Sequence, residues 1–326
     1  RYLAVMSTRR QALDAGTRLD RQQQRRALGT LSSLVVTQRT SKKYDEAVRS
    51  LFAFMKSEHI KLPPLFEEFD LVVCKYVEHC WQEGEGRSLV SNVLAGLQHF
   101  TPTVRGRLPC SWRLVSAWQR HELPARAPPL PSHLVRALAG CALRRHAPDV
   151  CVGLFVAFDG LLRTGELFGL RCKDFVVSED CQSVIVNLGL TKGGQRRGAS
   201  ESVVLYDEMT VSLLRARLLN SQPHDKLLHR SPANFRSLFD EMCRELGLEN
   251  WNFKPYSLRR GGATTHFQVH QSMSSVCVRG RWQNERTARL YINSGLAALA
   301  SASLTPDAVK ATKKAEGHLR KVLAGR

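Results

Sequence analysis

Apolar residues recur at helical spacing over most of the chain and give way to strand-like runs in only one region. Between Ser41 and Lys56 one helical face is apolar and the opposite face is polar and basic, which predicts an amphipathic helix. The apolar face consists of Tyr44, Val48, Leu51, Phe52 and Met55. Further helices are predicted at about 67 to 82 and 87 to 99. The stretch rich in proline and arginine from Thr101 to Pro131 predicts a loop region that ends a small helical domain near residue 128.

In the second half of the chain the spacing of apolar residues is less regular. Ser132 is a suitable N-cap for a helix that runs to about Arg145, and the segment 150 to 162 is apolar nearly all round, which predicts a buried helix. Two β-rich runs follow, SVIVNLGL at 183 to 190 and ESVVLY at 201 to 206. Between them TKGGQRRGAS indicates a hairpin with a basic, glycine-bearing tip. Helical spacing returns from Asp207.

This order of helices, a short antiparallel sheet and more helices predicts a mainly helical α+β fold. A length of 326 residues fits two domains, and the 43% apolar content is enough for two cores. We expect a basic arm at 1–29, an all-α domain at 30–128, a mixed domain with the small sheet at 129–298, and a basic tail at 299–326. A sequence that begins with Arg1 rather than Met is consistent with a piece of a longer chain.

The charge of the chain points to a polyanionic partner. The formal net charge is +19 and the isoelectric point is about 10.0. Such an excess of positive charge favours nucleic acid as the partner. A basic protein of the membrane surface is the competing interpretation, but the sequence has no apolar run of 18 residues and no lipidation motif.

The cysteines and histidines do not predict a metal site. Nine cysteines are scattered without a CxxC pair, which is typical of a reduced, intracellular protein. His266 and His270 are four residues apart, but no Glu follows the first of them as it does in zinc proteases. Two solvated or core histidines are the better interpretation, and we expect neither a metal nor a cofactor.

Two segments carry an arginine or lysine that is suited to binding phosphate. In GLLRTGELFGLRCKDF, Arg163 stands at the end of the buried helix and Glu166 follows three residues later. A buried arginine needs a partner, so the pair is either a structural ion pair or part of a site. Lys192 lies on the hairpin tip, where it is either a solvated lysine or one that reaches a nucleic-acid backbone.

Two later segments are less ordinary. YSLRRGGATTHF runs from Tyr256 to Phe267 and joins an arginine pair to two glycines, which permit close approach of another backbone or a ligand. A packed helix start with exposed arginines is the plainer explanation. GRWQNERTARLYI places Trp282 nine residues before Tyr291 on a polar and basic helix, where the tyrosine is either a reactive group or a cap on the core.

Taken together, the four segments resemble the catalytic half of the tyrosine recombinases, also called integrases. The order is Arg-xx-Glu, hairpin Lys, x-x-L-R-x-x-x-A-T, then Trp and Tyr, and it is most similar to the recombinases of eukaryotic Crypton and DIRS-type mobile elements. The resemblance covers about residues 132 to 295. It implies a catalytic set of Arg163, Lys192, Arg259, Trp282 and Tyr291, with Glu166 in support. Tyr256 stands where the family usually has His or Lys, three residues before the second arginine.

The resemblance implies cleavage and rejoining of DNA through a 3′-phosphotyrosyl bond on Tyr291, without a metal. It also implies a homotetramer on two DNA duplexes, in the nucleus of a eukaryotic host or otherwise with the bacterial nucleoid. The tail beyond Leu304 is then either a helix that docks on a neighbouring protomer or a solvated helix. Tyr256 leaves open a degenerate remnant that binds DNA without cutting it. An enzyme similar to type IB topoisomerases is the other alternative.

Overall fold

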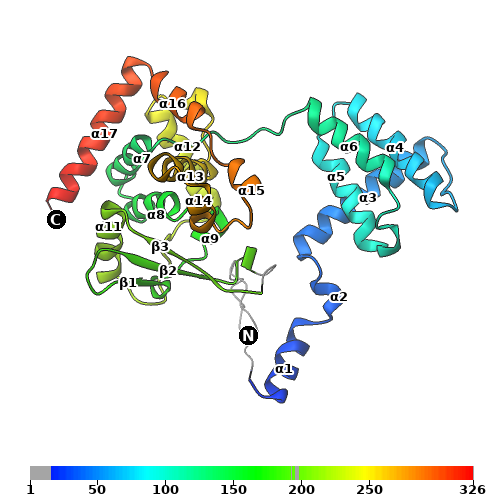
Figure 1. Ribbon diagram of the computed structural model, residues 1–326, viewed down its shortest axis with the longest axis horizontal. Helices are drawn as coiled ribbons and strands as arrows, with labels where there is room; N and C mark the ends of the chain where they lie inside the picture. Colours follow the sequence, from blue (N-terminus) through cyan, green and yellow to red (C-terminus); the bar gives the residue numbers. More distant parts are fainter. Residues whose placement is uncertain (1–15, 192, 195–197, 326) are drawn as a thin grey trace. The chain divides into compact units, whose positions relative to one another are not determined.

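A computed structural model describes residues 16–191, 193–194 and 198–325 of the chain (Figure 1). The contacts divide these residues into two compact units, one that ends at Ala125 and one that begins at Arg126. No helix among the described residues combines the length and the apolar character needed to cross a lipid bilayer.

The smaller unit is a helical bundle. Its elements are α1 (Arg18–Leu28), α2 (Leu31–Leu34), α3 (Gln38–Ser57), α4 (Phe66–Gln82), α5 (Arg87–Phe100), the 3₁₀ turn η1 (Pro102–Val104) and α6 (Pro109–His121). The three helices predicted by apolar spacing are therefore confirmed as α3, α4 and α5. Leu51 and Met55 point into the core as predicted, but Phe52 is 45% exposed, so the apolar face of α3 is narrower than the sequence indicated.

Helix α6 lies in the stretch that was predicted to be a loop, and that prediction was wrong. Pro109 is tolerated there because it occupies the first turn, where its missing N–H is not needed. Ser111, Val115 and Trp118 are buried on one face, at helical spacing. The surrounding prolines and arginines hid this short apolar face.

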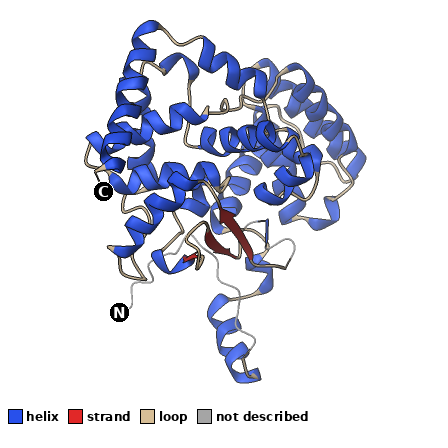
Figure 2. Cartoon of the chain, turned by 60° about the vertical axis from the view of Figure 1, so that its left-hand side comes forward, coloured by secondary structure: helices blue, strands red, loops and turns tan. Residues whose placement is uncertain are grey.

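The larger unit is a mainly helical α+β structure, as predicted, with a single small sheet visible among helices (Figure 2). Before and within the sheet lie α7 (Ser132–Arg144), α8 (Pro148–Asp159), α9 (Thr164–Leu167), the 3₁₀ turn η2 (Cys172–Asp174), β1 (Phe175–Val177), β2 (Val184–Gly189) and β3 (Glu201–Leu205). The sheet is antiparallel in the order β1-β2-β3. Strands β2 and β3 form the predicted hairpin. The short strand β1 had not been predicted.

The chain after the sheet is helical, as its spacing indicated. The elements are α11 (Glu208–Leu219), α12 (Pro232–Glu245), the 3₁₀ turn η3 (Glu249–Trp251), α13 (Tyr256–His270), α14 (Met273–Gly280), α15 (Glu285–Arg289), α16 (Ser294–Ala302) and α17 (Pro306–Ala324). Ser132 is the first residue of α7 rather than its N-cap, because Pro131 takes the cap position with extended backbone angles.

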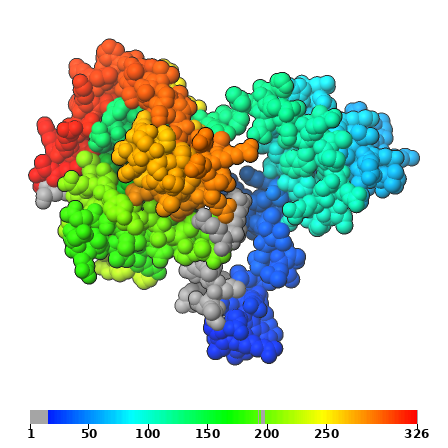
Figure 3. Space-filling model, in the orientation of Figure 1, coloured from blue at the N-terminus to red at the C-terminus, as the bar shows by residue number. Residues whose placement is uncertain are grey.

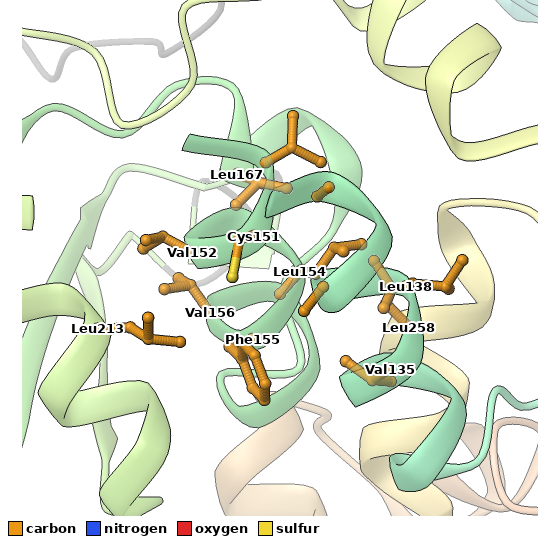
Figure 4. Close-up of a cluster of buried hydrophobic side chains, with 14 of the residues drawn as sticks. Val135, Leu138, Cys151, Val152, Leu154, Phe155, Val156, Leu167, Leu213 and Leu258 are labelled. Carbon is orange, nitrogen blue, oxygen red and sulfur yellow. The ribbon is translucent and has the colours of Figure 1, made fainter. Parts of the chain in front are cut away.

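Helix α8 is buried on every side, as predicted, and α7, α11 and α13 contribute side chains to the core around it (Figure 4). Leu258 anchors the beginning of α13 in this core. The glycine pair then allows backbone-to-backbone contact, as the sequence indicated. A Cβ at Gly261 would lie 2.0 Å from the Leu130 carbonyl oxygen, and one at Gly262 would lie 2.0 Å from that of Phe158. Helix α13 is thereby fixed against both neighbouring segments.

Helix α17 packs against α7 of its own unit (Figure 1). Arg136 on α7 donates a hydrogen bond to Glu316 on α17 at 2.7 Å. Gly140 faces the backbone of Ala315 so closely that a Cβ would lie 1.9 Å from the carbonyl oxygen. The tail is therefore a helix packed on its own unit rather than a solvated one.

Candidate active site

Arg163 and Glu166 form a partly buried ion pair just after α8. The chain leaves α8, passes through Leu161 in a left-handed conformation, and begins α9 with Arg163 at the N-cap. The backbone N–H of Arg163 donates to Glu166 Oε2 at 2.8 Å, and its Nη1 donates to Oε1 at 2.5 Å. The glutamate thus orients the arginine, whose side chain remains 31% exposed. The sequence indicated that Arg163 ends the buried helix, but in the structure it is the N-cap of the next, short helix.

Arg259 is completely buried on α13. It donates hydrogen bonds to the carbonyl oxygens of Leu161 and Gly280, and its guanidinium carbon lies 4.6 Å from the centre of the Trp282 ring. Burial, together with the neighbouring positive charges of Arg163 and Arg281, lowers the pKa of Arg259 to about 10. The group is still cationic at neutral pH.

Trp282 and Tyr291 lie side by side, although they do not share a helix as predicted. Trp282 occupies the turn before α15 and Tyr291 follows the end of α15, so that their ring centres are 4.5 Å apart. The indole N–H of Trp282 is buried and donates no regular hydrogen bond to a described residue. It nevertheless lies close enough to the Tyr291 hydroxyl to lower the pKa of that phenol. The segment of α14 and α15 lies on the visible face of the larger unit (Figure 3, gold to orange).

The hydroxyl of Tyr256 donates a hydrogen bond to the hydroxyl of Tyr291 at 2.7 Å. Burial raises the pKa of Tyr291, but the hydrogen bond from Tyr256 and the charge of Arg259 outweigh it, so the pKa lies below the ordinary value. Burial and the hydrogen bond to Tyr291 both raise the pKa of Tyr256. Tyr291 is therefore the phenol of the pair that ionises first, because its oxygen is the one that receives the donor.

Lys192 lies outside the described residues. The adjoining part of the hairpin is tied down from both sides. The Thr191 hydroxyl donates to the Glu201 carboxylate and accepts the N–H of Gly194 at 3.0 Å. Both Thr191 and Glu201 are buried.

Arg281 belongs to the same cluster, and the sequence analysis missed it. Its Nη2 lies 2.8 Å from Glu166 Oε2, and its Nε lies 3.5 Å from Glu201 Oε2. It therefore connects the strand end beside the hairpin tip to the glutamate that holds Arg163. Arg281 is buried because it follows α14 in a left-handed conformation, with φ of +59°, which turns its side chain inward. In the sequence it is one of several arginines in a basic run, with nothing to distinguish it.

Glu166 is thus surrounded by three guanidinium groups. Arg163 and Arg281 bind it directly, and Nη1 of Arg259 lies 3.9 Å away. Burial raises the pKa of Glu166, but the charges of Arg281 and Arg163 prevail and hold it below the ordinary value. Two carboxylates, Glu166 and Glu201, do not neutralise three arginines, so the cluster is suited to an anion placed beside Tyr291.

The sequence matches no family model and no curated protein. Solved structures do match. The Tn1549 transposon integrase in complex with transposon right end DNA gives a TM-score of 0.58 at 12% identity, over 86% of this chain and 96% of that one. A lambda integrase dimer bound to a COC′ core site gives 0.52 at 12% identity, over 82% and 75%. For a XerH site-specific recombinase bound to difH the TM-score is 0.47 at 14% identity, and the match spans 66% of that chain.

The chain has the tyrosine recombinase fold. Within this fold, six of the seven side chains singled out from the sequence lie close together. The seventh, Lys192, is outside the described residues. The six are Arg163, Glu166, Tyr256, Arg259, Trp282 and Tyr291.

The two histidines of α13 lie outside this cluster. Their ring centres lie 4.3 Å apart with the ring planes tilted by 47°, and His266 Nε2 lies 2.9 Å from the Ser275 hydroxyl. Among the described residues, no three His, Cys, Asp or Glu side chains gather as a metal ion would require.

Proposed function

We propose that this chain cuts and rejoins duplex DNA, with Tyr291 as the nucleophile. One observation carries the proposal: the Tyr291 hydroxyl accepts a hydrogen bond from Tyr256 and its ring lies against Trp282, with the guanidinium carbon of Arg259 5.4 Å from the ring centre. A phenol whose pKa is lowered beside an excess of guanidinium groups is a nucleophile aimed at a phosphodiester.

In this reaction the Tyr291 oxygen attacks phosphorus and its proton passes to solvent. The bond from phosphorus to the 5′ oxygen breaks, leaving a 3′-phosphotyrosyl bond and a free 5′ hydroxyl. Arg163 and Arg259 bind the non-bridging oxygens and stabilise the charge that builds up in the transition state. Lys192 supplies the proton to the departing oxygen, Trp282 positions the phosphate, and Tyr256 orients Tyr291.

Rejoining is the reverse reaction, in which a 5′ hydroxyl attacks the phosphotyrosyl bond. The phosphodiester energy is retained in that bond, so no nucleotide cofactor or metal is needed. We further propose that four protomers act on two duplexes, as the resemblance implies, and that the chain comes from a mobile element of the Crypton or DIRS type. A eukaryotic host would place the protein in the nucleus.

Tyr291→Phe is the decisive test, because phenylalanine keeps the shape of the ring and lacks the oxygen that becomes attached to DNA. With a nicked suicide substrate the parent should form an adduct that survives denaturation, and the variant should bind DNA equally well and form none. Mass spectrometry of the digested adduct locates the modified peptide. An adduct on another residue, or one that persists in Tyr291→Phe, refutes the assignment.

The same assay separates the alternatives. A remnant that only binds DNA would give no adduct in the parent. An enzyme similar to type IB topoisomerases would form the adduct, relax supercoiled plasmid and select no particular sequence from a random pool of duplexes. A recombinase should enrich a pair of inverted half-sites.

A further inference from the structure

Arg260 is a buried arginine without a counter-ion. It follows Arg259 directly on α13, and its exposed fraction is 6%. It makes no hydrogen bond or ion pair with any residue in the described ranges, and its Nε is enclosed and unpaired. Arginine is almost never buried unless it is paired, because removing a charge from water is costly.

The other buried arginines of this unit each lie close to a carboxylate. Arg259 and Arg281 both lie within 4 Å of Glu166. The less deeply buried Arg279 binds Asp159 through an ion pair. Arg260 has no comparable carboxylate among the described residues. Burial lowers its pKa, and the charge of Arg126 lowers it further. The nearby charge from the linker is thus of the same sign, which makes the demand for an anion greater.

The position of Arg260 relates it to the proposed active site. It stands four residues after Tyr256, so the two residues are one turn apart on the same face of α13. Tyr256 in turn binds Tyr291. Arg126 reaches this region because the segment behind it is fixed to α13: the N–H of Leu130 donates to the Ser257 carbonyl oxygen at 3.1 Å.

We propose that Arg260, together with Arg126, binds a phosphodiester group of the DNA strand next to the one that Tyr291 attacks. The proposal rests on the proposed function, since it takes the DNA strand to be the ligand. A guanidinium fits this role because its planar fork matches two phosphate oxygens. The bound phosphate supplies the counter-ion that Arg260 lacks among the described residues.

Arg260→Met is the main variant, because an apolar side chain of similar length removes an uncompensated buried charge. The full-length variant should unfold at the same temperature as the parent or higher, whereas removal of an arginine that holds the fold together would lower it. Its affinity for duplex DNA should fall about tenfold, as expected for loss of a charged hydrogen bond. The dependence of log K on log salt should become shallower by about 0.9. Arg236→Gln, an exposed arginine on α12, is the control for loss of one positive charge.

Single methylphosphonate groups, placed in turn at each phosphate around the nick, identify the contact. In the parent, one such neutral group next to the scissile phosphate should weaken binding about tenfold. In Arg260→Met the same group should have no further effect, while groups elsewhere still weaken binding. Arg126→Gln should reduce the response at that position, and Arg236→Gln should respond as the parent does.

Three results would overturn the proposal: parental affinity in Arg260→Met, a parental response to every methylphosphonate in that variant, or a lower unfolding temperature with unchanged binding. Failure of the proposed function looks different. In that case the parent forms no adduct with the nicked substrate, yet the position-specific response of Arg260 to a neutral phosphate is still present.

Discussion

Replacing Arg281 with Met should uncouple the strand end beside the hairpin tip from the pair of Arg163 and Glu166. The guanidinium of Arg281 binds Glu166 at 2.8 Å and lies 3.5 Å from Glu201, and it also donates to the Gly160 carbonyl oxygen at 3.1 Å. Methionine fills the space and makes none of these contacts. Two buried carboxylates then lose a cationic neighbour.

The expected cost follows from what remains around each carboxylate. Breaking a buried ion pair by removing one partner costs about 3 to 5 kcal/mol. Glu166 keeps Arg163 and Glu201 keeps the Thr191 hydroxyl, so the lower end, about 3 kcal/mol, applies. For a unit of this size each kcal/mol lowers the melting temperature by about 2 to 4 °C, which gives a decrease of roughly 6 to 12 °C.

Cleavage should decrease by about 10² even at a temperature where the variant is fully folded, since a small misplacement of catalytic groups has an effect of that size. Thermal unfolding of the full chain and single-turnover cleavage of a nicked duplex measure the two effects.

Arg279→Met is the matched control: Arg279 is two residues earlier, on α14, and binds Asp159 instead. It should lose comparable stability while cleavage of the folded protein changes only a few fold. A melting temperature for Arg281→Met within about 2 °C of the parent value would refute the calculation. Equal losses of cleavage in both variants would refute the positioning role.

Four further predictions concern the same cluster. Arg163→Ala should lower cleavage by at least about 10² with DNA affinity within a few fold, because the arginine acts on the transition state; equal losses in gel-shift and cleavage assays would make it an ordinary backbone contact. Tyr256→Phe removes the donor that lowers the pKa of Tyr291, so the rise of the single-turnover rate with pH should move to higher pH, and an unshifted profile would contradict this role. Tyr256→His should preserve or increase the rate, since it restores the group usual in the family. The pKa of Glu166 is lowered in the folded state, so its contribution to stability is present above the unfolded value of about 4.3 and disappears as the pH falls through the folded value. Denaturant titrations should therefore show a steeper loss below that pH for the parent than for Glu166→Gln.

The sequence alone determined the parts of this protein that depend on local periodicity and on the order of motifs. Apolar spacing predicted α3, α4, α5 and α8, and the β-rich runs predicted the hairpin, because a helix or strand that buries one face repeats its apolar residues at a fixed interval. The glycine pair of α13 indicated close backbone contact, which the structure has with Leu130 and Phe158. Helix α6 was missed because its apolar face is short and its neighbours are typical of loops.

Only the tertiary structure decided which of the many arginines belong together. Arg281 and Glu166 are 115 positions apart and meet because a left-handed residue at the end of α14 turns the side chain inward. Tyr256 touches Tyr291 across 35 positions because α13 is held against the backbone of two other segments. Arg260 is no different in the sequence from Arg259, and burial without a carboxylate is what distinguishes it. Charge and spacing along the chain report what one element does by itself, whereas the partner of a buried charge is set by the packing of elements that are distant in sequence.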